Sequence, residues 1–370
     1  MTAAFKETMT SRQRTICALT GQPYDRIPVN LLMSDHAARV IGVSVGEYQT
    51  SAKLMSLGQL TAWRTYGMDL INTGPGLTGI AEAAGSRLAF PDNTAYLADY
   101  ALKDAHDLER LRIPDPQRDG RLPLFLEAAS IVLNEVGNQV PVSLTTAGPF
   151  TTAANIRGPE HFLRDLHRDP KFVHNLLRFA TDSIFPFARA AYMLGAAIGL
   201  ADPVASGTLI SPGQFKEFAF PYLKELVTRL AEFAGVPPSL HICGKTSRIW
   251  REMADTGARV LSLDDEIDLA EARDAVGDRV ALVGNIRPTA TMVMGTTNDV
   301  RTNVLECLVK GGGSPKGYIL GLGCALPINT PPENVHALVA AAREYGRWPI
   351  DNELDLFFKN DSGHKNLFAW

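Results

Sequence analysis

One histidine and two cysteines stand at positions where their side chains could hold a metal ion. His241 and Cys243 are separated by one residue in the run SLHICGK, and Cys324 follows much later in GLGCALP. Imidazole nitrogen and thiolate sulfur are donors that suit zinc, whereas magnesium and calcium prefer oxygen. Three such donors would leave a fourth position open for a substrate. The set predicts a catalytic zinc site, against the alternative of a core histidine and two inert thiols.

The elements expected around these residues would bring the three side chains together. His241 and Cys243 end a predicted strand, and residues two apart in a strand point to the same side. Cys324 comes just past the last predicted strand, where Gly321 and Gly323 leave space and backbone freedom. Active sites of α/β barrels form at the carboxyl ends of their strands, so all three residues are expected at one mouth.

Eight short β-type runs alternate with longer amphipathic stretches such as Pro212–Ala234 and Pro332–Tyr345. Several of the runs are almost continuously apolar, as in parallel strands buried on both faces. This rhythm predicts a single (β/α)8 barrel. A β-hairpin is expected after the second strand, formed by 86–90 and 95–100 around the turn 91–93. The eight expected strands are Ile27–Met33, Asp69–Thr73, Val142–Thr146, Ala196–Ala201, Ser239–Cys243, Val260–Asp264, Val280–Val283 and Tyr318–Leu322.

The bulk properties favour one cytoplasmic domain. The 370 residues carry a formal net charge of −4 and no basic stripe, which argues against a nucleic-acid partner. No apolar run approaches the roughly 20 residues of a membrane span, and the N-terminus lacks the apolar stretch of a signal peptide. We expect a catalytic domain over 1–350 and a tail over 351–370, which could form an oligomer contact in a homodimer. Cys17 and Cys307 are interpreted as buried small hydrophobes.

Two aspartates after strands are candidate catalytic residues. Asp264 ends the strand after His241 and could be a fourth, displaceable zinc ligand, or it could cap a helix. Asp265 and Glu266, which follow it, fit capping or solvent exposure better. Asp202, in GLADPVASG, would point into the barrel mouth, where it could bind substrate or orient a zinc ligand. The alternative for Asp202 is a turn residue before Pro203.

Two further residues are candidates for cofactor binding at the same mouth. Glu82 follows the second strand in TGIAEAAG and is a weaker candidate of the same kind as Asp202. His36 follows the first strand in MSDHAAR and could also reach the mouth. A capping or surface histidine is an equally good interpretation of His36.

Four segments of the chain resemble the uroporphyrinogen decarboxylase-like superfamily: DRIPVN, LADPVASGTLISP, LHICGKT and GLGCALPINTPPENVHALVAAAREYG. The resemblance extends from about Thr10 to Tyr345. Within it, the H-x-C pair and the distant G-C are similar to the branch of zinc-dependent corrinoid methyltransferases, which includes the methylcobamide:coenzyme M methyltransferases and the methyltransferases of bacterial demethylation systems. The resemblance implies a (β/α)8 barrel, with His241, Cys243 and Cys324 as the zinc ligands.

The resemblance also implies a reaction and its partners. A methyl group would pass between a corrinoid and a small thiol or a methylated substrate, with zinc activating the partner that is not cobalt. No corrinoid-binding module is recognised in the chain, so the corrinoid, as co-substrate, is expected on a separate protein or as free methylcobalamin.

Two other functions are weighed against methyl transfer. One is metal-free decarboxylation of a porphyrinogen-like polycarboxylate. Decarboxylases of the superfamily carry an R-Q-A-G-R motif after the first strand, where this chain has SDHAAR from Ser34 to Arg39. The other is a barrel that serves only as a binding or assembly subunit, which the three converging donors do not favour.

Overall fold

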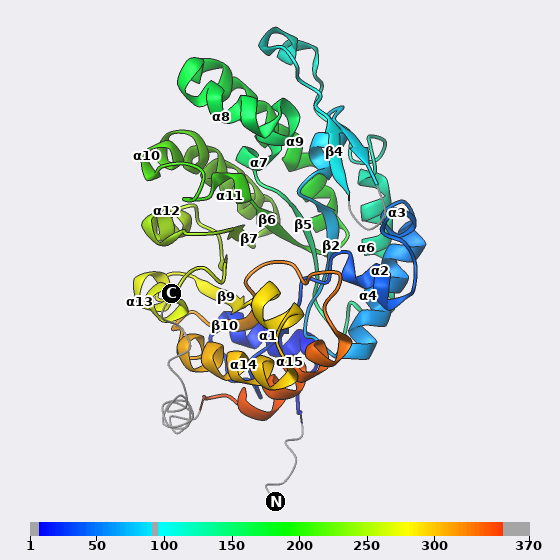
Figure 1. Ribbon diagram of the computed structural model, residues 1–370, viewed down its shortest axis with the longest axis vertical. Coiled ribbons are helices and arrows are strands. Elements are labelled where there is room, and N and C mark those ends of the chain that lie inside the picture. Colours follow the sequence, from blue (N-terminus) through cyan, green and yellow to red (C-terminus); the bar gives the residue numbers. More distant parts are fainter. Residues whose placement is uncertain (1–6, 91–94, 351–370) are drawn as a thin grey trace, which may run out of the picture.

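Eight parallel strands form one curled sheet in the computed structural model, which describes residues 7–90 and 95–350 (Figure 1). Their order is β1-β10-β9-β8-β7-β6-β5-β2, so from β2 to β10 the barrel strands follow one another in chain order, and the last strand, β10, pairs with the first, β1. The expected (β/α)8 barrel is confirmed. The strands are β1 Val29–Asn30, β2 Ile71–Gly76, β5 Val142–Ala147, β6 Ala197–Ala201, β7 Ser239–Ile242, β8 Val260–Leu263, β9 Ala281–Ile286 and β10 Tyr318–Leu322.

Hydrogen bonds join the two strands at the ends of this order and so close the barrel. The backbone N–H of Asp69, just before β2, donates to the carbonyl oxygen of Val29 in β1 at 2.7 Å. One step further, the side chain of Asn72 donates to Asn30 Oδ1 at 2.6 Å. The N–H of Val29 also donates to the Asp69 carboxylate at 2.8 Å, so the seam between β1 and β2 is held by one backbone bond and two bonds that involve side chains.

A buried ion network lies beneath this seam. The fully buried carboxylate of Asp69 accepts hydrogen bonds from Arg14 and Arg26, each at 2.6 Å, and both arginines are only 1% exposed. Asp25 and Glu7 are the other acidic partners of the two guanidinium groups among the described residues. Buried charges are tolerated only when they are paired and hydrogen-bonded, and here every charge has a partner.

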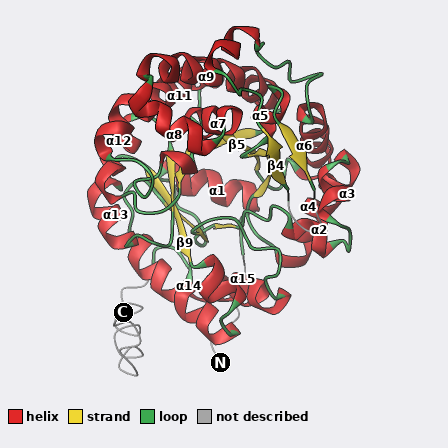
Figure 2. Ribbon diagram, turned by 45° about the horizontal axis from the view of Figure 1, so that its top comes forward, coloured by secondary structure: helices red, strands yellow, loops and turns green. Residues whose placement is uncertain are grey.

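The helices form an outer ring around the strands (Figure 2). Helix α1 instead crosses the amino-terminal end of the barrel, where the N–H of Arg12 donates to Gln139 O, just before β5. The α-helices are α1 Ser11–Thr20, α2 His36–Val40, α3 Val45–Gln49, α4 Ala52–Tyr66, α5 Gly79–Ala83, α6 Leu122–Val136, α7 Pro149–Arg157, α8 Pro159–Arg168, α9 Pro170–Met193, α10 Pro212–Gln214, α11 Phe220–Ala234, α12 Trp250–Asp255, α13 Leu269–Val276, α14 Thr297–Gly311 and α15 Pro332–Tyr345. In the described ranges, none of them is long and apolar enough to cross a membrane.

The expected elements are found with shifted boundaries. The first strand shrinks from the predicted Ile27–Met33 to two residues, and Pro28 next to it has no N–H to donate to a ladder. Strand β9 extends beyond the predicted end at Val283 to Ile286, and all six of its residues are buried. The stretch Pro212–Ala234 is not one helix, because a π-helical segment, Phe215–Ala219, separates α10 from α11.

The expected hairpin after the second barrel strand is confirmed. Its strands are β3 Arg87–Ala89 and β4 Tyr96–Asp99, which pair antiparallel. The turn expected at 91–93 and the tail expected at 351–370 lie outside the described residues.

Candidate active site

The three expected metal ligands meet at the carboxyl ends of the strands. His241 lies in β7, Cys243 follows one residue after that strand, and Cys324 follows two residues after β10. One donor atom from each lies within 4.8 Å of the others, and His241 Nε2 is 3.1 Å from Cys243 Sγ. Strands β7 and β10 are separated in the sheet by β8 and β9. Only the curvature of the barrel brings Cys324 to the other two.

A neighbouring strand fixes the orientation of the His241 ring. Its Nδ1 lies 3.1 Å from the carbonyl oxygen of Ser262 in β8, and 3.2 Å from the Ser262 hydroxyl. A carbonyl can only accept a hydrogen bond, so Nδ1 carries the proton and Nε2 keeps its lone pair. That is the tautomer in which Nε2 can bind a metal ion, and the second interaction of the ring is the kind that orients metal-bound histidines.

The pKa values of the two thiols are shifted in opposite directions. A hydrogen bond from Cys243, and after it the neighbouring His241 ring, lowers the pKa of Cys324 to about 4. The same hydrogen bond, then burial and the nearby charges of Asp264 and Asp265, raise the pKa of Cys243. A thiolate is the form that binds metals, so the cluster already holds one sulfur in the required state.

Asp264 lies beside the cluster but is engaged in holding the loop after Cys243. Its carboxylate accepts the N–H of Gly244 at 2.9 Å and that of Glu266 at 3.0 Å. Gly244 has φ +72°, and a Cβ there would collide with the hydroxyls of the preceding loop. Helix α13 is capped by Asp268, so Asp264 does not cap this helix, which was one of the two alternatives for this residue. The residue instead forms a turn, and its ligand role stays a prediction.

Asp202 does not point into the barrel mouth, and that expectation is wrong. Its carboxylate is fully buried and accepts the N–H groups of Phe150 and Thr151 at the start of α7, at 3.2 and 2.6 Å. Burial raises the pKa of Asp202 to about 6. Its backbone N–H donates to the carbonyl oxygen of His241 at 2.8 Å, so Asp202 ties the end of β7 to α7.

His36 and Glu82 also miss the mouth. The His36 ring is 1% exposed and lies between Tyr66 Oη, at 3.2 Å, and the carbonyl oxygen of Ile328, at 3.1 Å. It therefore anchors the loop that follows Cys324. Both carboxylate oxygens of Glu82 accept a hydrogen bond from Arg121 Nε, at 3.0 and 2.9 Å. Glu82 is therefore paired with Arg121 and is not among the described residues that line the cavity above the donors.

A cavity of about 420 Å³ opens above the donor cluster, and His241, Cys243 and Cys324 all line it. Its inner wall is polar but uncharged, with hydroxyl and amide side chains projecting from the barrel strands: Asn30, Asn72, Ser143, Thr145, Ser239 and Ser262. The sequence interpretation missed these residues. Ser239 could have been found, because it precedes His241 by two positions and so shares its side of the strand.

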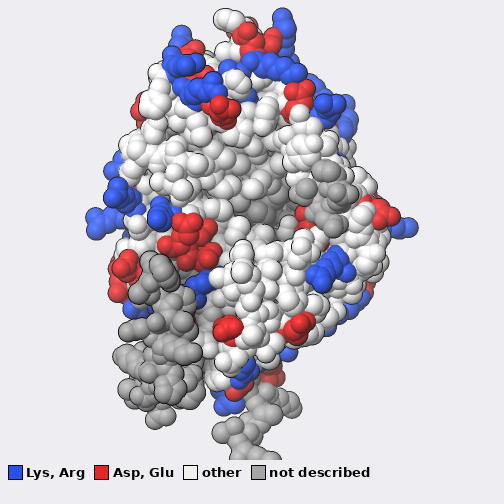
Figure 3. All heavy atoms as spheres, in the orientation of Figure 1, with Lys and Arg blue, Asp and Glu red and all other residues white. Residues whose placement is uncertain are grey.

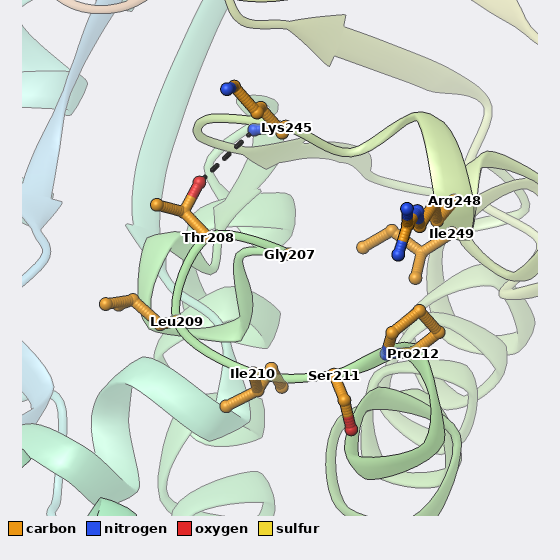
Figure 4. Close-up of a pocket in the computed structure, with 9 residues that line it drawn as sticks. All are labelled: Gly207, Thr208, Leu209, Ile210, Ser211, Pro212, Lys245, Arg248 and Ile249. Carbon is orange, nitrogen blue, oxygen red and sulfur yellow. Dashed lines mark hydrogen bonds between the residues drawn. The ribbon is translucent and has the colours of Figure 1, made fainter.

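A second hollow, of about 380 Å³, lies between the loops after β6 and β7 (Figure 4). Lys245 and Arg248 line it, together with the run from Gly207 to Pro212. The backbone N–H of Lys245 donates to Thr208 Oγ1 at 3.4 Å, which joins the two loops. The basic side chains that follow Cys243 in the sequence thus face a different space from the cysteine itself.

An eight-stranded parallel barrel with soft metal donors at the carboxyl ends of its strands defines an α/β-barrel enzyme. The chain belongs to the uroporphyrinogen decarboxylase (URO-D) family, and the sequence model of that family matches residues 10–345. It is 31% identical over 345 residues to the methylcobamide:CoM methyltransferase MtaA of Methanosarcina barkeri, covering 91% of this chain and 98% of the relative.

Two further matches agree with this assignment. The methylcobamide:CoM methyltransferase MtbA of Methanosarcina acetivorans is 29% identical over 344 residues, covering 91% of this chain and 98% of the relative. A solved methyltransferase structure from Methanosarcina mazei superposes with a TM-score of 0.83 at 29% identity, covering 91% of this chain and 99% of that one. These matches place the chain among the methyltransferases of the family.

Proposed function

We propose that this methyltransferase is zinc-dependent and moves a methyl group between a corrinoid and a small thiol or methylated substrate. The observation that carries the proposal is the convergence of His241, Cys243 and Cys324 at the floor of a cavity. Relatives named for methylcobamide and coenzyme M support the corrinoid as the other reactant. The corrinoid would arrive on a separate protein or as free methylcobalamin.

The donor set fits zinc by its chemistry and its spacing. Zinc binds sulfur at about 2.3 Å and imidazole nitrogen at about 2.0 Å. Two donors of one zinc ion therefore lie no more than about 4.6 Å apart, which is close to the 4.8 Å that encloses all three atoms. The free Nε2 of His241 and the thiolate of Cys324 are in the protonation states that a metal requires.

Three residues of the chain hold the proposed metal-binding pair, His241 and Cys243, in place. Ser262 keeps His241 in one tautomer, and Asp202 and Asp264 fix the backbone on either side of the metal-binding pair. When bound, zinc would hold a substrate thiol as its thiolate or polarise the heteroatom that carries a methyl group. In the thiol direction a sulfur–carbon bond forms, the cobalt–carbon bond breaks, its electron pair stays on cobalt, and the thiol proton is released.

Porphyrinogen decarboxylation is not favoured. A polycarboxylate substrate needs basic side chains, and no lysine or arginine is among the described residues that line the cavity. The test is elemental analysis of the purified protein, followed by a spectroscopic assay of methylcobalamin with thiols and of the reduced corrinoid with methylated substrates. About one zinc per chain and zinc-dependent transfer are expected. A metal-stripped enzyme of undiminished activity would refute the zinc role.

A further inference from the structure

Among the residues that the structure describes, no lysine or arginine lines the cavity above the donor cluster. Its described lining consists of apolar, hydroxyl and amide side chains, the three soft donors and one carboxylate, that of Asp35. On the face that carries the central hollow, the surrounding atoms are mostly neither basic nor acidic, and lysine and arginine gather towards the edges (Figure 3). An anion that enters a partly buried space without a cation loses its hydration and gains no partner.

Four basic residues on neighbouring elements lie outside the cavity lining: Arg121 and Arg39 are held by hydrogen bonds, and Lys245 and Arg248 are exposed. Arg121 is paired with Glu82, and its Nη1 donates to the carbonyl oxygen and the side-chain oxygen of Gln49, both at 2.9 Å. Arg39 donates to the carbonyl oxygen of Ile328 at 3.2 Å. Lys245 and Arg248 line the separate hollow (Figure 4). In the part of the chain that the structure describes, none of these four residues lines the cavity.

The cavity does offer hydrogen-bond acceptors. Asp35 is half-buried, and one of its carboxylate oxygens accepts a hydrogen bond from Gln49 Nε2 at 2.7 Å. The other oxygen has no hydrogen bond to a described residue. Gln59 is 1% exposed and donates to Tyr48 Oη at 2.9 Å, but its own Oε1 is buried without a partner. A buried acceptor without a donor costs free energy, which a ligand with an N–H or O–H group would recover.

We propose that the cavity selects a methyl donor or acceptor whose remote end is neutral or cationic and donates hydrogen bonds, and that it discriminates against sulfonates and carboxylates. This inference rests on the proposed function, because it concerns the substrate of the same site. Under this proposal coenzyme M, which is 2-mercaptoethanesulfonate, is a poor methyl acceptor for this enzyme. The carboxylate of Asp35 sets the sign of the preference, and Gln59 supplies a second acceptor.

The test uses three thiols that differ only in the group at their far end. They are 2-mercaptoethanol, cysteamine and 2-mercaptoethanesulfonate, which are neutral, cationic and anionic at that end. The specificity constant for each is measured with methylcobalamin, for the wild type and for Asp35→Asn. For each thiol, the specificity constant of Asp35→Asn is divided by that of the wild type. This ratio cancels the intrinsic reactivity of the thiol. Asp35 makes no side-chain cap bond to α2, so the substitution should not unfold the protein, and thermal melts verify this.

In the wild type, the specificity constants for the neutral and cationic thiols are expected to exceed that for the sulfonate by about tenfold or more. Asp35→Asn should lower the value for cysteamine, raise that for the sulfonate, and change that for mercaptoethanol by less than about twofold. Asp274→Asn is the matched control, because it removes the same charge from an exposed site on α13. It should change none of the three ratios.

Calorimetric binding of the S-methyl derivatives of the cationic and anionic thiols gives a second measurement that needs no turnover. The derivative of cysteamine should bind more tightly than that of the sulfonate. A sulfonate that reacts or binds as well as the other compounds overturns the inference while zinc-dependent methyl transfer stands. Absence of zinc and of any methyl transfer refutes the proposed function instead, and equal binding of both derivatives would then refute the inference as well.

Discussion

His241 Nδ1 lies 3.1 Å from the carbonyl oxygen of Ser262, in the strand next to its own. Because the acceptor is a backbone oxygen, no substitution of Ser262 removes it. The contact orients the ring so that Nε2 faces Cys243. A ligand held from behind in this way loses less conformational entropy when it binds a metal. The contact therefore holds the His241 ring in the orientation that a metal ligand needs.

The first prediction concerns metal content. The wild type should contain about one zinc per chain, and Cys324→Ala should lose most of it, because two protein ligands hold zinc poorly. Cys324 is exposed and contributes little to the core, so the variant should melt close to the wild type. Cys17→Ala, outside the cluster, is the control and should keep its zinc. Full zinc occupancy in Cys324→Ala would remove Cys324 from the ligand set.

The second prediction concerns Asp264→Asn. Both carboxylate oxygens accept backbone N–H groups, and an amide can accept only one of these two bonds. The variant should keep zinc through the other three ligands and lose on the order of 1 kcal/mol in the free energy of unfolding. Elemental analysis, chemical denaturation and kinetics are compared with Asp265→Asn. Loss of substrate affinity with unchanged stability would mean that Asp264 is a displaceable ligand.

The third prediction concerns Asp202→Ala. The substitution leaves two buried N–H groups at the start of α7 without an acceptor, which should cost roughly 2 to 4 kcal/mol in the free energy of unfolding. Asp182→Ala removes an aspartate that pairs with Arg229 at the surface and should cost less than about 1 kcal/mol. Urea unfolding of both variants decides the matter. Similar losses would contradict the cap that the structure assigns to Asp202.

The fourth prediction concerns the buried network under the barrel seam. Asp69→Ala leaves Arg14 and Arg26 buried without their shared partner and should cost about 3 to 5 kcal/mol. The exposed pair Arg64–Glu135 supplies the comparison, and Glu135→Ala should cost less than about 1 kcal/mol. If the two variants unfolded at the same urea concentration, the network would contribute nothing to the closure of the barrel.

The fifth prediction is a pH dependence within that network. Burial raises the pKa of Asp25, but hydrogen bonds from Arg14 and from the N–H groups of Thr8 and Met9 outweigh it and lower the pKa from 3.8 to about 2. The stability that Asp25 contributes is therefore fully present above pH 4 and is lost as pH falls towards 2. The difference in unfolding free energy between wild type and Asp25→Asn should shrink by roughly 1 to 2 kcal/mol across that window.

The measurement is urea unfolding at about pH 6 and about pH 3. Asp274→Asn, at an exposed site, should show no such change. The contribution of Asp202 to stability changes with pH in the opposite direction and increases as pH falls from about 6 to 3.8. Its raised pKa makes the folded protein bind an additional proton in this range. A constant difference for Asp25→Asn at all pH values would contradict the pairing of Asp25 with Arg14.

The sequence determined the eight strands, the hairpin and the three donors, because each depends on local information. Apolar runs bounded by turns define buried parallel strands, and the two-residue spacing of His241 and Cys243 places them on one side of β7. Strand ends could not be fixed in the same way. Whether Ile286 still belongs to β9 depends on the neighbour β10, with which it pairs.

The directions of single side chains were decided only by the tertiary structure. Asp202 and Asp264 both follow a strand, yet one turns back to cap α7 and the other holds Gly244, because unpaired backbone N–H groups of distant segments lie there. His36 forms a hydrogen bond with the carbonyl oxygen of Ile328, and Glu82 forms an ion pair with Arg121. The sequence indicates neither partner. The approach of Cys324 to His241 depends on the closure of the whole barrel, which no local pattern encodes.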